Sequence, residues 1–472
     1  MTLNEIVNYL NGIAWGPWML ILLVGTGVYL SAKVGFIQFA KFGYVMKNTA
    51  GKLFKKQSAG EGEVTPFQAL ATALAATVGT GNIAGVTGAI AIGGPGAVFW
   101  MWISALFGMV TKYAEVVLAV RYRERNAKGD WVGGPMYYIK NGLGQKWNWL
   151  AVLFSVLGCL AAFGIGNMTQ VNTIAGAINN AIDAFGGNTA ANSFELFGQM
   201  VPFTSVVIGG IVAFIVALTL FGGVKRIGTV TERLVPVMAA IYIACALCVV
   251  GTNITSVGKV FAMIIKGAFS AEAALGGAFG ITIMTTIQKG VGRGVFSNEA
   301  GLGSAPIAHA ATSETDPVRQ GLYGIFEVFM DTIVICTLTA LTLMCGVESG
   351  GVAISWGQSA GAELIAASFG TIFGNQIGSL IVAMGIGLFA LTTILSWSLY
   401  GTRCFEFLFK GKGVGVFQTV FVTVIVIGAT LKLDLVWNIA DTLNGFMAIP
   451  NLIALLGLSG VVIKLTKEHF AK

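Results

Sequence analysis

Apolar windows long enough to cross a membrane recur eleven times along this chain, and they restrict its fold more than any other feature. A helix of about 20 residues spans the ~30 Å hydrocarbon layer of a bilayer and pairs all of its own backbone groups, which lipid cannot do. We therefore predict an all-α polytopic membrane protein with eleven transmembrane helices. The windows cover residues 12–32, 67–92, 96–120, 148–180, 203–222, 230–252, 271–290, 319–346, 376–400, 414–431 and 436–463.

Composition agrees with this prediction and excludes other classes of protein. Apolar residues make up 55% of the 472 residues and charged residues 10%, with a mean hydropathy of +0.80, whereas roughly 25% of a soluble chain is charged. The 65 glycines follow no collagen-like period, and membrane helices use small residues where backbones approach closely. Cys245 and Cys248 share one apolar window without a second pair, which favours packing over a metal or redox site.

The placement of basic residues predicts the orientation. With the N-terminus outside, all but four of the 28 Lys and Arg residues fall in cytoplasmic segments; three are external and Lys112 lies inside a helix. This asymmetry is typical of a plasma or inner cell membrane protein with an outside N-terminus and a cytoplasmic C-terminus. The net charge of +7 then reflects orientation and contact with anionic lipid rather than nucleic-acid binding. The cytoplasmic segments are 33–66, 121–146, 225–233, 289–319, 403–412 and 464–472.

The second window is interrupted by glycine near mid-membrane. Gly79 and Gly81 flank Thr80 and precede Asn82, and glycine weakens a helix interior by ~1 kcal/mol relative to alanine. Unwound backbone is tolerated at this depth where it lines a cavity, and its N–H groups at the start of the next half-helix suit a carboxylate. We expect a substrate-binding break here, with close packing of helices through small residues as the alternative.

A second glycine-interrupted window, 271–290, begins five helices later and contains Gly276 and Gly277. Paired interrupted helices in corresponding positions indicate a transporter site between inverted repeats. We predict one repeat of helices two to six (67–252) and another of helices seven to eleven (253–463), with the site between helices two and seven. An extra N-terminal helix and basic segment (1–66) precede the repeats, and a cytoplasmic tail (464–472) follows them.

Helix four carries an aromatic ring and two amides at helical spacing. Phe163, Asn167 and Gln170 stand at i, i+4 and i+7, so they are expected to share one face. Such a face offers a wall and two amides that donate to a carboxylate or accept from an amine. The alternative is that the amides hold neighbouring helices together.

Helix nine presents the hydroxyls of Thr392, Thr393 and Ser396. Together with backbone carbonyls these groups could supply the oxygens that a Na⁺ ion needs. The alternative is that each hydroxyl bonds to the carbonyl four residues back in its own helix.

Charged residues inside the membrane are functional candidates by default. Glu327 and Asp331 are i, i+4 on helix eight, and Asp331 lies ~18 Å beyond Arg319 along the helix, near mid-membrane. Three roles stay open for Asp331: binding a cation, relaying a proton, or pairing with another residue. Lys112 and Glu115 are expected to form an ion pair near the inner end of helix three.

The stretch GGPGAVFWMWISALFG at 93–108 closely resembles the signature of the alanine/glycine:cation symporter family, the sodium:alanine symporters. Residues 79–85, 162–172 and 293–306 are similar to that family too, so the resemblance spans essentially the whole chain. It implies a leucine-transporter-like fold of five-plus-five inverted repeats with one extra N-terminal helix.

The resemblance also implies roles for individual residues. The groups implied to receive the substrate carboxylate belong to the interrupted segment: Thr80, Gly81 and Asn82, beside Gly79. The carbonyl of Thr77 would help to hold the ammonium group, and Gly276, Gly277 and Phe279 would close the pocket from helix seven. The oxygens implied to bind Na⁺ are two carbonyls and two hydroxyls: Ala75, Val78, Thr392 and Thr393.

Two features are not part of these implied substrate and Na⁺ sites. The 293–306 motif falls in a segment assigned to the cytoplasm, so we expect a gating or structural role for it rather than substrate contact. Lys289 departs from the family pattern, in which an uncharged residue is more usual just before Gly290.

Secondary transport is the function that these features favour: sodium-coupled uptake of alanine and glycine by alternating access. The partners are then a small neutral amino acid, Na⁺ as the coupling ion and the lipid bilayer, with no organic cofactor and no nucleic acid. A proton-coupled or uncoupled carrier is the alternative, and an ion channel is disfavoured because no continuous polar lining or charged ring is visible. An enzyme is disfavoured as well, since His309 and His469 lie far apart and no metal motif is present.

Overall fold

Helices dominate the computed structural model, which describes residues 3–52, 59–196, 199–270, 281–431 and 434–471. The helices up to the middle of the chain are α1 (Leu3–Ala14), α2 (Pro17–Lys33), α3 (Ile37–Ala40), α4 (Phe42–Asn48), α5 (Pro66–Thr77), α6 (Val86–Gly93), α7 (Ala97–Arg121), α8 (Pro135–Tyr138), α9 (Asn148–Phe163), α10 (Thr169–Ala184), α11 (Phe203–Leu220) and α12 (Gly223–Thr252). Those that follow are α13 (Ile254–Phe269), α15 (Ile283–Asn298), α16 (Ala305–His309), α17 (Pro317–Val328), α18 (Thr337–Glu348), α19 (Ala362–Phe373), α20 (Asn375–Phe409), α21 (Val414–Thr430), α22 (Asp434–Gly457) and α23 (Ser459–Ala471).

Short elements join and interrupt these helices. The strands form two antiparallel hairpins, β1 (Glu124–Arg125) with β2 (Trp131–Val132) and β3 (Ser193–Leu196) with β4 (Gln199–Pro202). The π-helical turns are Gly81–Gly85, Ile139–Leu143, Gly164–Met168 and Phe329–Cys336, and the 3₁₀ turns are Ala50–Lys52, Gln145–Trp147 and Thr189–Asn192.

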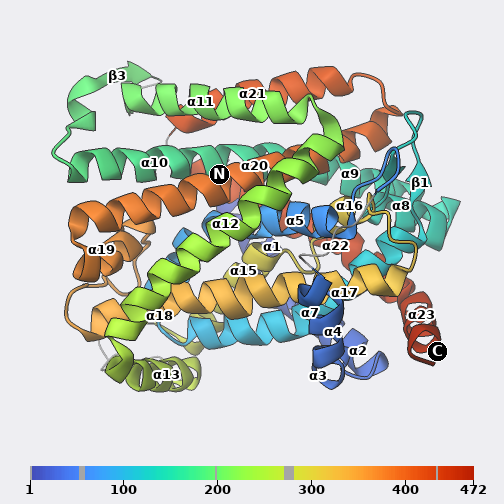
Figure 1. The fold of residues 1–472 in the computed structure, drawn as a ribbon, viewed down its shortest axis with the longest axis horizontal. Coiled ribbons are helices and arrows are strands. Elements are labelled where there is room, and N and C mark those ends of the chain that lie inside the picture. Colours follow the sequence, from blue (N-terminus) through green and yellow to red (C-terminus); the bar gives the residue numbers. More distant parts are fainter. Residues whose placement is uncertain (1–2, 53–58, 197–198, 271–280, 432–433, 472) are drawn as a thin grey trace.

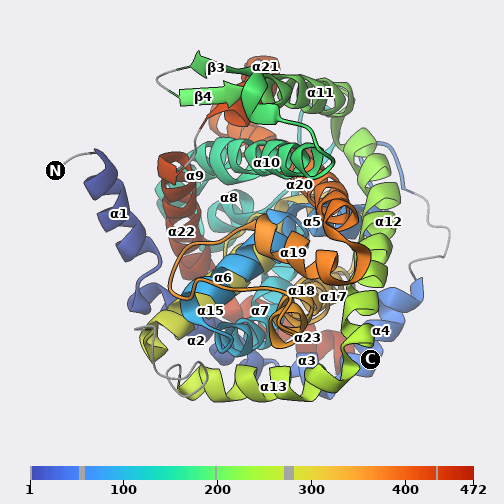
Figure 2. The same cartoon turned by 90° about the vertical axis from the view of Figure 1, so that its left-hand side faces the viewer.

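The long helices lie side by side along one axis of the molecule. Figure 1 shows α10 beside α20, α11 beside α21 and α7 beside α17, and Figure 2 looks along this bundle. In the described part of the chain, eight helices are long and apolar enough to cross a membrane, and the bent pair α5–α6 makes a ninth. The prediction of an all-α polytopic membrane protein is therefore confirmed at this level.

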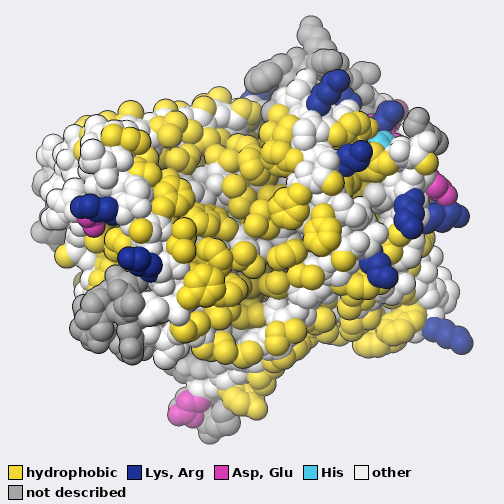
Figure 3. Space-filling view, turned by 90° about the horizontal axis from the view of Figure 1, so that it is seen from below, with side chains coloured by type: hydrophobic (Ala, Val, Ile, Leu, Met, Phe, Trp, Pro, Cys, Tyr) yellow, Lys and Arg dark blue, Asp and Glu magenta, His cyan; other side chains and the backbone are white. Residues whose placement is uncertain are grey.

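The surface agrees with insertion in a bilayer. In Figure 3 apolar side chains cover the middle of the molecule, while Lys and Arg side chains lie toward its two ends. Ile21 on α2, Phe214 on α11 and Val416 on α21 are between 64% and 72% exposed. A soluble protein rarely exposes so large an apolar surface, so the belt faces lipid.

The break in the second predicted helix lies where the glycines predicted it. Thr65 and Gln68 form a capping box and Pro66 begins α5, which therefore has a well-defined start. The helix ends at Thr77, Val78 leaves helical geometry with ψ near 85°, and the chain resumes through the π-helical turn with a bend of 48° between the two halves.

The seventh helix differs from its prediction. Helix α15 runs from Ile283 to Asn298, so it continues past residue 290, where the seventh helix was predicted to end, and the described break separates α15 from α16. The break predicted at Gly276 and Gly277 lies outside the described residues. Within the break between α15 and α16, Glu299, Gly301 and Gly303 take positive φ angles of 55°, 91° and 81°. Hydropathy alone does not identify the whole of this helix, because Lys289 and Arg293 lie in it. The apolar residues that precede it placed the predicted window, 271–290, too early in the chain.

Candidate functional site

The two broken helices cross at their breaks. A Cβ atom added to Gly81 would lie 3.3 Å from the ring of Phe296 and 3.4 Å from the Cα atom of Ser297. Only a residue without a side chain fits so close an approach comfortably. The predicted meeting of helices two and seven is thus formed by α15, at the 293–306 motif that the sequence had assigned to gating.

Asp331 joins the crossing helices to the π-helical turn between α17 and α18. One carboxylate oxygen accepts hydrogen bonds from Asn82 Nδ2 at 2.6 Å and from Ser297 Oγ at 3.1 Å, and the other accepts from Thr332 Oγ1 at 2.7 Å. All four side chains are at least 98% buried. Of the three roles left open for Asp331, pairing with neighbours is therefore observed, and Asn82 is engaged in this cluster.

Polar backbone groups are concentrated at the first break. Gly79 N donates to Asn82 Oδ1 at 2.9 Å, and Thr80 N reaches Gln170 Oε1 at 3.4 Å. The hydroxyl of Thr80 is buried without a hydrogen-bond partner among the residues that the structure describes. Thr80 thus offers a lightly held N–H group and an unsatisfied hydroxyl at one buried point.

Oxygen atoms gather one turn earlier. Thr393 Oγ1 lies 3.0 Å from the carbonyl oxygen of Ala75 and 3.3 Å from that of Ala76. A Cβ atom on Gly79 would come within 2.5 Å of the same hydroxyl, so glycine is required there by the approach of α20. Thr392 is directed elsewhere, with its hydroxyl on the Phe389 carbonyl at 2.9 Å and near the sulfur of Met238.

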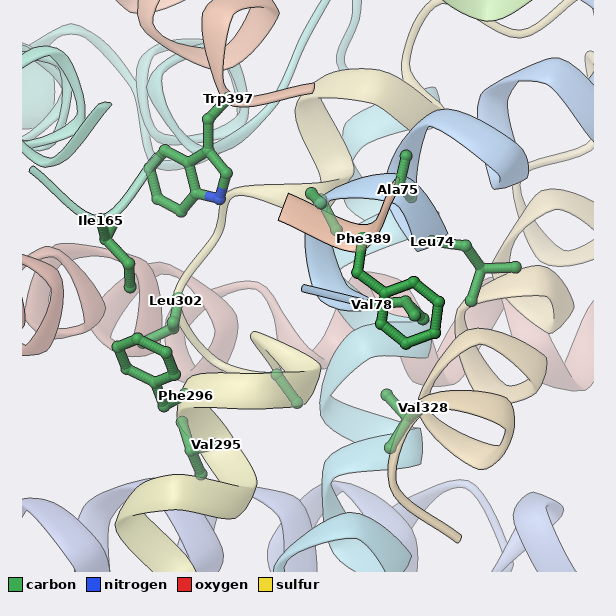
Figure 4. Packing of buried hydrophobic residues seen from close by; sticks show 14 of the residues in the cluster. Leu74, Ala75, Val78, Ile165, Val295, Phe296, Leu302, Val328, Phe389 and Trp397 are labelled. Atoms are coloured by element: carbon green, nitrogen blue, oxygen red, sulfur yellow. The ribbon is translucent and has the colours of Figure 1, made fainter. Parts of the chain in front are cut away.

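Buried side chains enclose both sets of polar groups. Ala75, Val78 and Phe389 belong to one hydrophobic cluster that also contains Phe296 and Trp397. Figure 4 shows Ala75 and Val78 on the α5 side and Phe296 on α15. Such a surrounding keeps water away and strengthens electrostatic interactions at the break.

The face predicted for helix four is not formed. Phe163 packs against Phe417 and Phe421, with ring centroids 5.2 and 5.8 Å apart, and Asn167 donates to the carbonyl of Phe421 at 2.7 Å. Both therefore face α21, while Gln170 faces Thr80. The π-helical turn Gly164–Met168 is the reason, because its wider winding shifts every later residue off the α-helical spacing.

The carboxylates of Glu115 and Glu299 hold the second break, and the sequence analysis did not predict this role for either residue. Glu115 Oε1 accepts from the backbone N–H groups of Gly301 at 3.0 Å and Gly303 at 3.1 Å, and from Asn451 Nδ2 at 2.6 Å. Glu299 accepts from Trp397 Nε1 at 2.8 Å and from Ser304 Oγ. The available signal was the combination of polar residues with two glycines over 297–304, Ser-Asn-Glu-Ala-Gly-Leu-Gly-Ser, in so apolar a chain.

Lys112 does not pair with Glu115 as expected. Its ammonium group lies 3.2 Å from Glu327, which also contacts His309 Nε2 at 3.1 Å. All of these side chains are fully buried. This group links α7, α16 and α17, so it fixes the half-helix that follows the second break.

A cavity of about 720 Å³ opens beyond the first break. Its walls include Gly85 and Gly88 near the bend, Lys289 and Arg293 of α15, and the segment 359–363 before α19. The charge pattern had placed 359–363 outside and 289–293 inside. Because both segments line one cavity, these two side assignments cannot both hold.

The opposite end of the two broken helices is closed by a set of contacts that we call the latch. Val64, before α5, pairs with the segment after α16 through hydrogen bonds of 3.0 and 2.8 Å to Ala311 and Ser313. The guanidinium of Arg123 stacks on Trp131 at 4.2 Å from the ring centroid. It also donates to three carbonyls of the same segment, those of Ala310, Thr312 and Glu314.

This architecture, two broken membrane helices crossing at a buried polar break, defines a polytopic transporter. The chain belongs to the sodium:alanine symporter family, whose model matches residues 1–472. It is 45% identical to the sodium/alanine symporter AgcS of Methanococcus maripaludis, over 99% of this chain and 97% of that one. It is 46% identical to an uncharacterized transporter of Haemophilus influenzae, over 100% and 97%.

The fold matches a solved transporter structure as well. The crystal structure of MhsT in complex with L-phenylalanine aligns with a TM-score of 0.57 at 14% identity, covering 86% of this chain and 99% of that one. The leucine-transporter-like fold that the resemblance implied is confirmed by this match. Family and relatives are transporters, so amino-acid symport rather than enzymatic catalysis is the activity of the chain.

Proposed function

We propose that the chain is a sodium-coupled symporter that takes up small neutral amino acids, alanine and glycine among them, by alternating access in the cell membrane. The relative from Methanococcus maripaludis is a sodium/alanine symporter, and we propose the same ion and substrate for this chain. No organic cofactor is needed for such transport, because the ion gradient supplies the driving force.

The observation that carries the proposal is the pairing of anion donors with cation acceptors at one buried break. Thr80 presents an N–H group and an unsatisfied hydroxyl, and Thr393 Oγ1 and the Ala75 carbonyl lie 3.0 Å apart one turn away. N–H groups at the start of a half-helix attract a substrate carboxylate, and freed carbonyls coordinate Na⁺. The break therefore suits an amino-acid zwitterion together with a cation.

In this proposal the backbone of Thr80 and Gly81 and the amide of Gln170 hold the substrate carboxylate, and the carbonyl of Thr77 receives the ammonium group. Gly79 permits the close approach of α20, and Asn82 positions the break through Asp331. Na⁺ is bound by the carbonyls of Ala75 and Val78 and the hydroxyl of Thr393. Thr392, also implied as a ligand by the family resemblance, is left out of the proposal because its hydroxyl is directed to Phe389 and Met238. Gly276, Gly277 and Phe279, proposed to close the pocket, lie outside the described residues.

We further propose eleven membrane helices in two inverted repeats after an N-terminal helix. In support, each proposed repeat (67–252 and 253–463) contains one broken helix, α5–α6 or α15–α16, followed by one long helical segment, α7 or α17–α18. The third helices, α9–α10 and α20, pack against each other, as do the fourth ones, α11 and α21. The extra N-terminal helix is α1 with α2.

We propose that the N-terminus lies outside and that α23 ends in the cytoplasm. In support, most Lys and Arg side chains visible in Figure 3 gather at one end of the molecule. That end contains α23 and the region of β1 and α8, which the positive-inside pattern assigns to the cytoplasm (Figure 1).

Uptake by purified protein in liposomes tests this function. We expect labelled alanine to accumulate under an inward Na⁺ gradient and not under a proton gradient or with no gradient. Accumulation driven by protons alone would overturn sodium coupling. Counterflow of labelled against unlabelled alanine would separate a carrier from a channel, because a channel does not exchange its solute.

A further inference from the structure

A groove in the apolar surface of the molecule is lined by three helices that pack against one another, α2, α7 and α15 (Figure 2). It has a volume of about 500 Å³, and its walls include Trp100 and Ile103 of α7 and Ile287 and Val291 of α15. Helix α2 forms the remaining wall, where a Cβ atom added to Gly25 would meet no other residue within 4 Å. The groove is therefore open at Gly25, which has no side chain to fill it.

The length of this groove matches one leaflet of a bilayer. Its α2 wall extends from Leu20 to Tyr29, which is ~14 Å at 1.5 Å per residue. Half of the hydrocarbon layer of a bilayer measures ~15 Å. The groove thus has the length of a lipid acyl chain within one leaflet, and its apolar walls favour hydrocarbon over water.

Polar groups gather at one end of the groove, near the C-terminus of α2. The hydroxyl of Tyr29 lies 3.3 Å from Ser459 Oγ, and Lys33 Nζ lies 5.8 Å from the centroid of the Tyr29 ring. Lys33 is exposed, and no acidic side chain among the described residues forms a salt bridge with it. An exposed ammonium group beside two hydroxyls suits the phosphate of an anionic lipid headgroup.

We propose that the groove is a binding site for one phospholipid with an anionic headgroup, whose acyl chain lies along α2 and whose phosphate contacts Lys33 and Tyr29. The orientation proposed above places Lys33 at the cytoplasmic surface, where the leaflet carries anionic lipids. Because Ile287 and Val291 belong to α15, the bound lipid supports the half-helix that precedes the second break. Binding to the folded protein also raises its stability by mass action.

Native mass spectrometry of the purified protein with added phosphatidylglycerol or phosphatidylcholine tests this lipid site. We expect the wild type to bind phosphatidylglycerol about fivefold more tightly, the contribution of one lysine close to an anionic headgroup. Its Tm should rise with the concentration of phosphatidylglycerol. Lys33→Gln should remove the preference between the headgroups and keep weak binding of both lipids, whereas Gly25→Leu fills the groove and should weaken the binding of both.

Two matched variants separate the lipid site from general effects. Lys47→Gln removes an equal charge from an exposed position of α4 that does not line the groove. Gly210→Leu adds the same side chain as Gly25→Leu to an exposed glycine of α11 that has equally open surroundings. Both variants should bind the two lipids as the wild type does, and Lys33→Gln remains informative if Gly25→Leu does not fold.

The inference is overturned if the wild type binds both lipids equally. It is also overturned if Lys47→Gln loses the headgroup preference as fully as Lys33→Gln does, because the attraction would then be a general effect of charge. Equal binding of phosphatidylglycerol by Gly25→Leu and Gly210→Leu would place the lipid outside the groove. None of these measurements involves transport, so absence of Na⁺-driven alanine uptake would reject the proposed function and not the lipid site.

Discussion

At the residue scale, Gln170 is the side chain most directly tied to the first break, since its Oε1 atom faces Thr80 N. We predict that Gln170→Ala weakens alanine binding by ~1.5–3 kcal/mol, the usual worth of a hydrogen bond to a charged group. Isothermal titration calorimetry in saturating Na⁺ measures this. Asn179→Ala, on the same helix but bonded to Ser205, is the control and should bind as the wild type does. Equal affinity in all three proteins would mean that Gln170 only joins helices.

Thr392 and Thr393 are neighbours on α20, but their hydroxyl groups make different contacts. Thr393 reaches the Ala75 carbonyl whereas Thr392 lies near Met238. We therefore expect Thr393→Val, which keeps the shape but removes the hydroxyl, to raise the Na⁺ concentration for half-maximal uptake about tenfold, or ~1.4 kcal/mol. Thr392→Val should raise it far less. A larger effect for Thr392→Val would place the cation on the other face of α20.

At the element scale, the latch ties the beginning of α5 to the segment after α16. Arg123→Gln removes the stacking on Trp131 and the donors to three carbonyls, and each lost hydrogen bond costs ~0.5–1.5 kcal/mol. We predict faster amide hydrogen exchange in residues 305–314, because local opening then requires less free energy. Hydrogen exchange with mass spectrometry measures it.

Arg319→Gln serves as the matched control for the latch. Arg319 is mostly exposed, and within the described part of the chain its side chain contacts Asp316, three residues earlier at 3.7 Å, so its loss should leave exchange in 305–314 unchanged. Protection that is lost equally in both variants would indicate general destabilisation. Unchanged protection in Arg123→Gln would mean that the backbone pairing of Val64 is sufficient to hold the end closed.

The elements also show what the sequence could and could not predict. The first break was readable because Gly79 and Gly81 interrupt an otherwise strongly apolar run. The break predicted at Gly276 and Gly277 lies outside the described residues, and the break between α15 and α16 was not predicted. Because α15 carries Lys289 and Arg293, apolar length failed as a criterion where a helix lines a polar cavity. The orientation of Phe163 was unpredictable from spacing, since one π-helical turn changes which face a residue occupies.

At the scale of the whole molecule, the cavity beside the first break is open while the latch and the buried Lys112–Glu327–His309 group close the other end. Under the alternating access and the orientation proposed above, this is the outward-facing state, and closure of the cavity around the substrate is the next step. Ala84 lines the cavity just past the break and is half-buried, so a side chain there reports on that closure.

We predict that a membrane-impermeant thiol reagent labels Ala84→Cys from outside intact cells, and that Na⁺ with alanine slows the labelling several-fold because they close the cavity over the cysteine. Thr315→Cys, exposed at the latch end, should react only after the membrane is permeabilised. Labelling of the unsubstituted protein gives the background from its own cysteines, of which Cys248 is the exposed one among those described. Labelling of Thr315→Cys in intact cells would reverse the orientation. Labelling of Ala84→Cys that ignores Na⁺ and alanine would separate the cavity from the transport path.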